Sequence, residues 1–230
     1  MPYGGNDWLA LTQEETIEPE MPICDPHHHF WDFRVERIPY DRYLLHELAA
    51  DVNSGHNIVS TVFVEARSMY RTDGVENLRS VGEVEFVQGL AAASASGLYG
   101  PTRAAAAIIG AADISLGEAV EPILEALQAA SPNRFRGVRR AATWDPHPDV
   151  ENRAEKGLLA TADFKAGAQL LASKGLILEN TIYFPQLPEL ADFANTVPDL
   201  TIVLNLSLIH ISEPTRRTPI SYAVFCLKKK

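Results

Sequence analysis

The chain has 230 residues, of which 46% are hydrophobic, and a formal net charge of −10. This length favours one or two globular domains. The acidic balance disfavours a nucleic-acid partner, because phosphate binding requires clustered lysine and arginine, although a few local arginines can still bind a small anion. No apolar run approaches the ~18 residues of a membrane span, and no signal peptide is visible, so we expect a cytoplasmic protein without a membrane partner.

Strand and helix patterns alternate along the chain after a polar N-terminal arm at residues 1–20. Apolar and β-branched runs predict six strands, at 23–29, 58–65, 104–110, 135–141, 176–183 and 201–205. Apolar residues at three-to-four spacing predict the helices between them, at 43–51, 75–95, 116–130, 163–174 and 187–197. This alternation favours an α/β fold with a parallel sheet, either open and doubly wound or closed into a barrel.

The most informative stretch is the run 25–32, which reads Asp-Pro-His-His-His-Phe-Trp-Asp. Because successive side chains of a strand point to opposite faces, we expect His27 and His29 to project together and His28 to point away. Two imidazoles side by side are half of a site for a divalent metal, most readily zinc. The alternative is an exposed loop that binds metal only by chance.

Other candidate site residues stand at the ends of predicted strands. Glu65 ends the second strand, and Arg139 and Arg140 end the fourth. An arginine can hold a substrate carboxylate with two parallel hydrogen bonds. Glu65 is equally well explained by an ion pair with a nearby base. Neighbours in a strand point to opposite faces, so only one of the two arginines is expected to face a barrel centre. The sequence assigns no catalytic acid or base.

The composition changes abruptly at residue 207. Residues 207–230 hold five basic residues and one acidic residue, a net charge of +4, which leaves −14 for residues 1–206 of the total of −10. This change predicts a domain at 21–206 followed by a non-native tail, which resembles translated sequencing-adapter sequence. A divergent, lysine-rich C-terminus is the alternative. Cys24, at the apolar start of the first strand, is predicted to be a small buried residue.

The histidine run resembles the Asp-x-His-x-His signature of the amidohydrolase-related (amidohydrolase 2) family, metal-dependent hydrolases with a TIM-barrel fold. The Trp-Asp pair that ends the run is similar to the lactonase branch of that family. Three further motifs carry the resemblance over about residues 17–205: Thr-Val-Phe-Val-Glu-Ala at 61–66, Phe-Arg-Gly-Val-Arg at 135–139 and Pro-Gln-Leu-Pro-Glu-Leu at 185–190.

The resemblance implies a (β/α)8 TIM barrel, truncated here after about six strands. It implies a hydrolase that opens a lactone or related cyclic ester of a small carboxylate substrate by activated water. His27 and His29 would bind the metal, and Glu65, Arg139 and Arg140 would contact the substrate. The alternatives are a metal-dependent decarboxylase of the same superfamily and an inactive fragment.

This chain also departs from the family pattern. Relatives often carry histidines where Arg140, Phe184 and Leu206 stand here, and their strand 8 supplies an aspartate that this chain does not reach. Two imidazoles therefore remain where a catalytic zinc takes three protein ligands. Some relatives in the lactonase branch use no metal, so the resemblance leaves the metal requirement open, as it does the oligomeric state.

Overall fold

The computed structural model describes residues 11, 15–33, 40–205 and 225–227. In this part of the chain, seven strands form one sheet in the order β1-β2-β3-β4-β5-β6-β7. The strands are β1 (Ile23–His28), β2 (Ile58–Val64), β3 (Arg103–Ala111), β4 (Phe135–Ala141), β5 (Ile177–Thr181), β6 (Ile202–Leu204) and β7 (Phe225–Leu227). Strands β1 to β6 pair in parallel with their neighbours in sequence, and β7 pairs antiparallel with β6.

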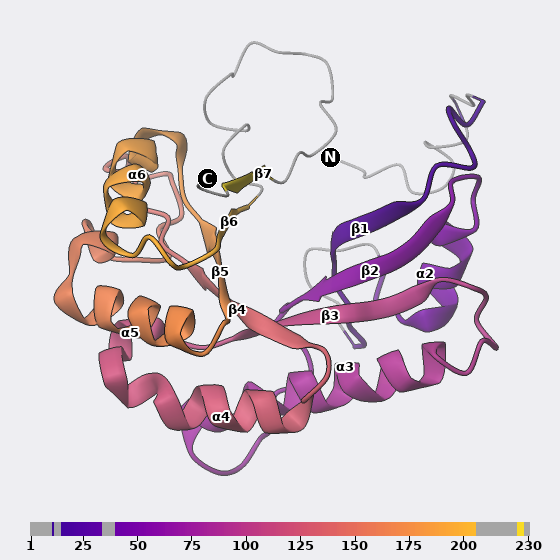
Figure 1. Ribbon diagram of the computed structural model, residues 1–230, viewed down its shortest axis with the longest axis horizontal. Helices are drawn as coiled ribbons and strands as arrows, with labels where there is room; N and C mark the ends of the chain where they lie inside the picture. The colour runs from indigo at the N-terminus through magenta and orange to yellow at the C-terminus, as the bar shows by residue number, and fades with distance from the viewer. Residues whose placement is uncertain (1–10, 12–14, 34–39, 206–224, 228–230) are drawn as a thin grey trace.

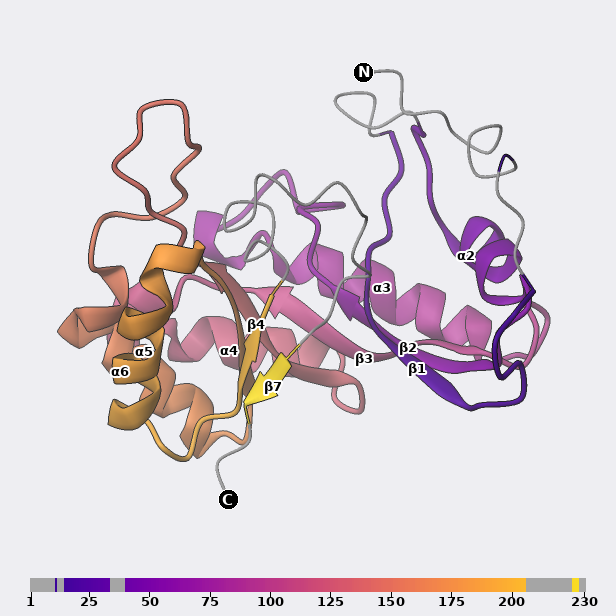
Figure 2. The same cartoon turned by 90° about the horizontal axis from the view of Figure 1, so that it is seen from above.

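Five α-helices of the described residues lie outside the curled sheet, on its convex side (Figures 1 and 2). They are α2 (Leu45–Val52), α3 (Val81–Ser94), α4 (Glu121–Ala130), α5 (Ala162–Ser173) and α6 (Leu187–Thr196). Four short 3₁₀ helices join them to the strands: η1 (Glu76–Leu78), η2 (Ile114–Val120), η3 (Leu158–Ala160) and η4 (Phe184–Gln186). The six parallel strands and their helices form a curled half-barrel, which confirms the predicted α/β fold.

The hydrophobic core fills the space between the sheet and the helices. Phe63, Ile108 and Leu178 of the strands are fully buried, as are Leu124 and Leu127, which share one face of α4. Full burial of a side chain of this size stabilises the fold by about 1.5–3 kcal/mol. This packing holds the strands in place, so the residues at their ends are positioned by the core.

The predicted helix at 116–130 divides into η2 and α4. Gly117 has a φ of 62°, which is not a helical angle, and a proline stands in the first turn of α4. Proline is favoured at a helix start because its missing N–H has no intrahelical partner there. The helix predicted at 75–95 divides in a similar way into η1 and α3.

The prediction that Cys24 is buried is wrong, because its side chain is exposed. Within the described residues, β1 is the first strand of the sheet and pairs only with β2, and its side chains alternate between partly buried and exposed up to His27, before the buried His28. Cys24 falls on the exposed side of that alternation. The predicted arm and tail fall largely outside the described residues.

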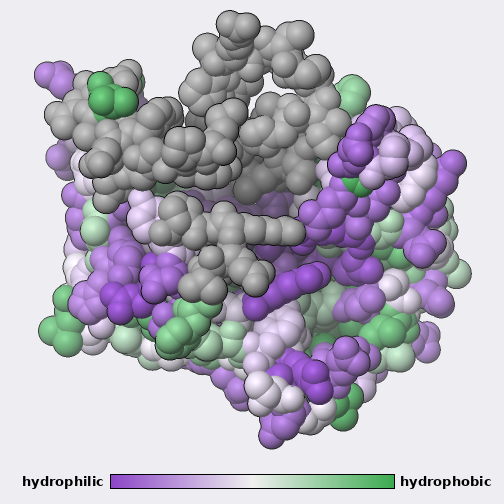
Figure 3. Space-filling model, turned by 180° about the vertical axis from the view of Figure 1, so that it is seen from behind, coloured by the Kyte–Doolittle hydropathy of each residue, from purple (hydrophilic) through white to green (hydrophobic). Residues whose placement is uncertain are grey.

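The surface seen from behind mixes hydrophilic residues with several separate hydrophobic areas (Figure 3). Large hydrophobic side chains that are exposed, such as Val75 and Leu98, come from different loops. Among the described helices, none combines the length and the apolar character needed to cross a membrane.

Candidate functional site

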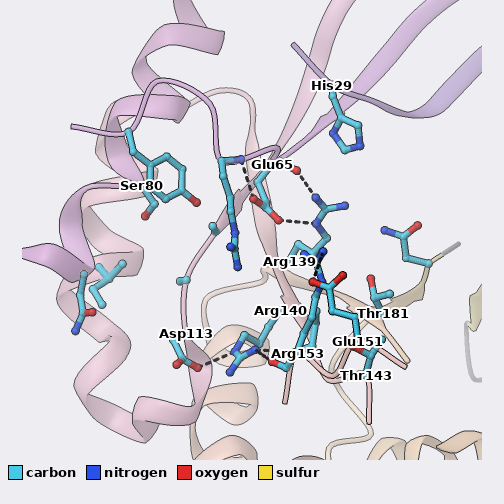
Figure 4. Close-up of a pocket in the computed structure, with 18 of the residues that line it drawn as sticks. His29, Glu65, Ser80, Asp113, Arg139, Arg140, Thr143, Glu151, Arg153 and Thr181 are labelled. Carbon is cyan, nitrogen blue, oxygen red and sulfur yellow. Dashed lines mark hydrogen bonds and ion pairs between the residues drawn. The ribbon is translucent and has the colours of Figure 1, made fainter. Parts of the chain in front are cut away.

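A cavity of about 930 Å³ opens where the parallel strands end (Figure 4). The carboxyl ends of parallel barrel strands are where active sites lie. The predicted site residues His27, His29, Glu65, Arg139 and Arg140 all line this cavity. The structure therefore brings together the side chains that the sequence singled out from three separate strands.

His27 and His29 face each other at the end of β1. Their Nε2 atoms lie 3.2 Å apart. His29 Nδ1 lies 2.7 Å from the carbonyl oxygen of Val64, and a carbonyl can only accept, so Nδ1 carries the proton. In the neutral ring, the lone pair of His29 Nε2 therefore points toward His27.

His27 is held in its neutral form. Burial lowers its pKa to about 3, with further lowering by the positive charges that His29, Arg139 and His28 can carry. A neutral imidazole is the form that binds a metal. On its other side, His27 Nδ1 lies 3.6 Å from the carboxylate of Glu179 on β5.

His28 points away from this pair, as predicted, and is buried. Its Nε2 lies 2.8 Å from the hydroxyl of Thr61 on β2, which also accepts the backbone N–H of Ala105 on β3 at 2.9 Å. Burial lowers the pKa of His28 to about 3. The middle histidine thus belongs to a polar chain across three strands behind the cavity.

Arg139 is the central cation of the site. Its Nε donates to Glu65 Oε1 at 2.7 Å, and its Nη2 donates to the backbone carbonyl of Glu65 (Figure 4). Its Nη1 lies 3.8 Å from Glu179 Oε1, and the amide of Asn205 donates to that same carboxylate oxygen. Burial nevertheless raises the pKa of Glu179 to about 7.

Arg140 has different partners from Arg139, although both arginines line the cavity. Its Nε donates to Asp113 Oδ1 at 2.9 Å, and its Nη1 donates to the carbonyl of Ala141 at 2.6 Å. Burial acts to raise the pKa of Asp113, but the hydrogen bonds from Ser115 and Arg140 outweigh it and lower the pKa below its ordinary value. Arg140 lines the cavity together with Asp113, at some distance along the wall from the histidines (Figure 4).

A buried carboxylate that sequence reasoning missed, Glu83 in the first turn of α3, supports the loop after β2. Its Oε1 accepts the backbone N–H groups of Ala66 and Ser68 at 2.9 and 2.8 Å. Burial raises its pKa to about 7, against the lowering effect of those two hydrogen bonds. The acidic residue was visible in the helix pattern, but its partners come from a distant loop.

Gln186 holds two other loops of the site. Its Oε1 accepts the N–H groups of Trp144 and Tyr183, and its Nε2 donates to the carbonyl of Ala142 at 2.8 Å. The motif that begins at Pro185 therefore has a structural function here. It joins the loop after β4 to the loop after β5, so both cavity walls keep their relative positions.

The spacing of the two Nε2 atoms, on His27 and His29, matches the spacing of two ligands of one divalent metal ion. Two nitrogens of a tetrahedral zinc site, each about 2.0–2.1 Å from the ion, lie about 3.3 Å from each other. The Nε2 atoms of His27 and His29 are 3.2 Å apart, and a single proton lies between them where a cation would replace it. Within the described residues, no group of three or more histidine, cysteine or acidic side chains is arranged to hold a metal.

Comparisons with known proteins place this geometry in context. No family model matches the chain. The uncharacterized protein y4mH of Sinorhizobium fredii is 24% identical over 213 residues, which cover 85% of this chain and 65% of that protein. The chain therefore spans less than two thirds of that relative.

Solved structures give the clearest likeness. Amidohydrolase 2 from Bifidobacterium longum subsp. infantis matches with a TM-score of 0.50 and 21% identity, over 84% of this chain and 65% of that chain. An amidohydrolase from Burkholderia multivorans with bound zinc matches with a TM-score of 0.52 and 23% identity, over 79% and 56%. At this level of identity the likeness concerns the fold. The described part of this chain thus has the fold of part of a TIM barrel, the fold of these amidohydrolases.

Proposed function

We propose that this chain is part of a hydrolase of the amidohydrolase 2 family that opens a lactone or related cyclic ester of a carboxylate substrate. The observation that carries the proposal is the pair of Nε2 atoms, on His27 and His29, that converge 3.2 Å apart beside a cavity of about 930 Å³. The fold supports it, since one solved structure that shares this fold contains zinc.

A divalent metal bound by this pair, with zinc the first candidate, would lower the pKa of a bound water toward ~7 and polarise the substrate carbonyl. The chain's own residues prepare that site. The hydrogen bond from His29 Nδ1 to Val64 fixes the orientation of the ring, which is the usual role of the second nitrogen of a metal-binding histidine. Burial keeps His27 neutral.

The three proposed substrate-binding residues differ in which of their polar groups still lack a hydrogen bond within the described part of the chain. Arg139 uses Nε and Nη2 on Glu65, which leaves Nη1, 3.8 Å from Glu179 and beyond hydrogen-bond distance of it, for a substrate oxygen. Arg140 uses Nε and Nη1 on Asp113 and the backbone, which leaves Nη2. Glu65, neutralised by Arg139, acts by positioning that arginine. The two arginines therefore each contribute one remaining group to binding, and Glu65 contributes through Arg139.

The proposed activity is tested with a panel of lactones that carry one or two carboxylates, assayed by proton release after addition of zinc. We expect ring opening that is lost with a chelator and in His27→Ala, while His147→Ala, a histidine exposed on the surface, keeps it. Release of CO₂ without ring opening would favour the decarboxylase. Turnover unchanged by the chelator would contradict the proposed metal site.

A further inference from the structure

The charges that line the cavity are nearly all paired. Three of its arginines form ion pairs with carboxylates that also line it: Arg139 with Glu65 at 2.7 Å, Arg140 with Asp113 at 2.9 Å and Arg153 with Glu151 at 3.3 Å. Arginines engaged in this way have part of their hydrogen-bonding capacity occupied. They are poorly placed to be the main site for an incoming anion.

Arg67 is the exception among the described arginines of the cavity. It lines the cavity and is exposed, and its guanidinium has no acidic side chain within ion-pair distance in the described part of the chain. The remaining carboxylate on the wall, Glu76 of η1, is also exposed and forms no ion pair with it. Among the described residues, no acidic side chain therefore competes with a ligand for this guanidinium fork.

The loop that carries Arg67 is held by two carboxylates through its backbone. The N–H of Arg67 donates to Glu65 Oε2 at 3.2 Å. The N–H groups on either side, of Ala66 and Ser68, both donate to the buried Glu83. Three consecutive backbone donors are therefore satisfied by side chains, which fixes the path of the chain at this position.

The same loop adopts backbone angles that side-chain-bearing residues rarely take. Arg67 has a φ of 56° and Met69 a φ of 54°. Such residues persist only where the surroundings determine them, and they cluster at binding and active sites. The loop also packs directly on the start of α3, since a Cβ on Gly82 would lie 2.7 Å from the carbonyl oxygen of Met69.

From these observations we propose that Arg67 is the specificity-determining residue of the cavity, binding a carboxylate of the substrate through its guanidinium, and that Glu83 is the residue that positions it. The proposal rests on the proposed function, which it deepens by naming the group that selects anionic substrates. The fixed loop reduces the conformational entropy that binding costs. Planar carboxylates suit this fork, because they accept two parallel hydrogen bonds from one guanidinium.

The test is the binding of isophthalate, a planar dicarboxylate, and of its neutral diamide to the full chain, measured by calorimetry. We expect the protein to bind isophthalate at millimolar concentration or below and the diamide at least about tenfold more weakly, a factor that corresponds to about 1.4 kcal/mol. Arg67→Asn should weaken isophthalate binding at least tenfold, since asparagine tolerates the same φ but carries no charge. Arg67→Lys, which keeps the charge without the fork, should fall in between.

Arg71→Asn is the matched control, because Arg71 lies in the same segment but pairs with Glu85 and does not line the cavity. It should change isophthalate binding less than twofold. For the positioning role, Glu83→Ala should weaken binding as Arg67→Asn does, whereas Glu83→Gln, which keeps an acceptor oxygen, should restore most of it.

Equal affinity of Arg67→Asn and the parent protein for isophthalate would overturn the proposal. So would equal affinity of the parent for the acid and its diamide, or no binding of the acid. Isophthalate has no bond to hydrolyse, so these results do not depend on turnover. A protein that binds isophthalate through Arg67 but opens no lactone would overturn the proposed function alone.

Discussion

Arg139, near the end of β4, is hydrogen-bonded to Glu65, the residue that follows β2. Its guanidinium donates to both the carboxylate and the backbone carbonyl of Glu65. The link passes over β3, which lies between these strands in the sheet. Glu179 approaches the same guanidinium from β5, at 3.8 Å. One cation thus compensates two carboxylates that are themselves largely buried.

Arg139→Met is expected to lower the free energy of unfolding by about 3–5 kcal/mol, because it leaves buried charge without compensation. Urea denaturation measures the loss. Arg140→Met is the control, since its partner Asp113 is 47% exposed, and pairs of that kind contribute about 0–1 kcal/mol. The double variant Arg139→Met with Glu65→Gln should lose less than the sum of the two single variants. Additive losses would contradict the coupling.

His27→Ala and His29→Ala are each expected to weaken zinc binding at least about 100-fold, because loss of a ligand exceeds the 10–100-fold effect of changing a residue that orients one. Titration calorimetry with zinc measures the affinity. His147→Ala, in an exposed loop where its side chain is 63% accessible, is the matched control and should bind zinc like the parent. Equal affinity in all three variants would exclude the histidine pair as the metal site.

The stability of the protein should depend on pH through Glu83. Burial raises the pKa of this carboxyl to about 7 in the folded protein, whereas the unfolded chain has the ordinary value near ~4.3. Between these two values Glu83 binds a proton in the folded state but not in the unfolded state, so its contribution to stability falls as the pH rises. This contribution changes by on the order of 3 kcal/mol across the window, so the stability difference between the parent and Glu83→Gln should change with pH by that amount. The contribution of Glu179, whose pKa burial also raises to about 7, persists in the variant.

Urea denaturation between about pH 4.5 and pH 8 checks this pH dependence. Glu85→Gln is the control, since Glu85 lies on the same helix but is exposed and paired with Arg71. The stability of this variant should follow that of the parent protein with pH. If Glu83→Gln also kept the parent's pH dependence, another group would be responsible.

Two glycines in helices should respond in opposite ways to alanine. A Cβ on Gly167 of α5 would overlap the carbonyl oxygen of Ile114, so Gly167→Ala should destabilise the fold by at least about 1 kcal/mol. A Cβ on Gly89 of α3 would meet nothing within 4 Å, and Gly89→Ala should stabilise by about 0.5–1 kcal/mol through helix propensity. Thermal unfolding measures both, and the same sign in the two variants would contradict the packing of α5 on η2.

The elements of the fold that repeat a simple pattern could be predicted from the sequence. The strand at 135–141 has the predicted bounds, and the two-residue period places His27 and His29 on one face and His28 on the other. Local exceptions escaped prediction, such as the positive φ of Gly117, which divides a helix whose apolar spacing looks continuous.

The supporting residues of the site could not be predicted in the same way. Glu83 and Glu179 look like ordinary acidic residues in a helix and a strand, and their importance comes from partners on other elements. Arg67 owes its position to backbone angles that its residue type does not favour. Such features depend on the tertiary arrangement, which a single sequence records only indirectly.

The bond between His28 and Thr61 has a consequence for the accuracy of strand pairing. A slip of β1 by one residue would send every side chain to the opposite face, so the cavity would receive the middle imidazole and lose the flanking two. The slipped arrangement would also separate Thr61 from His28. Thr61 is fully buried, so water could not replace the lost hydrogen bond. His28 thus helps to fix the pairing register of β1. Although it does not line the cavity itself, its hydrogen bond to Thr61 determines that the two flanking histidines do.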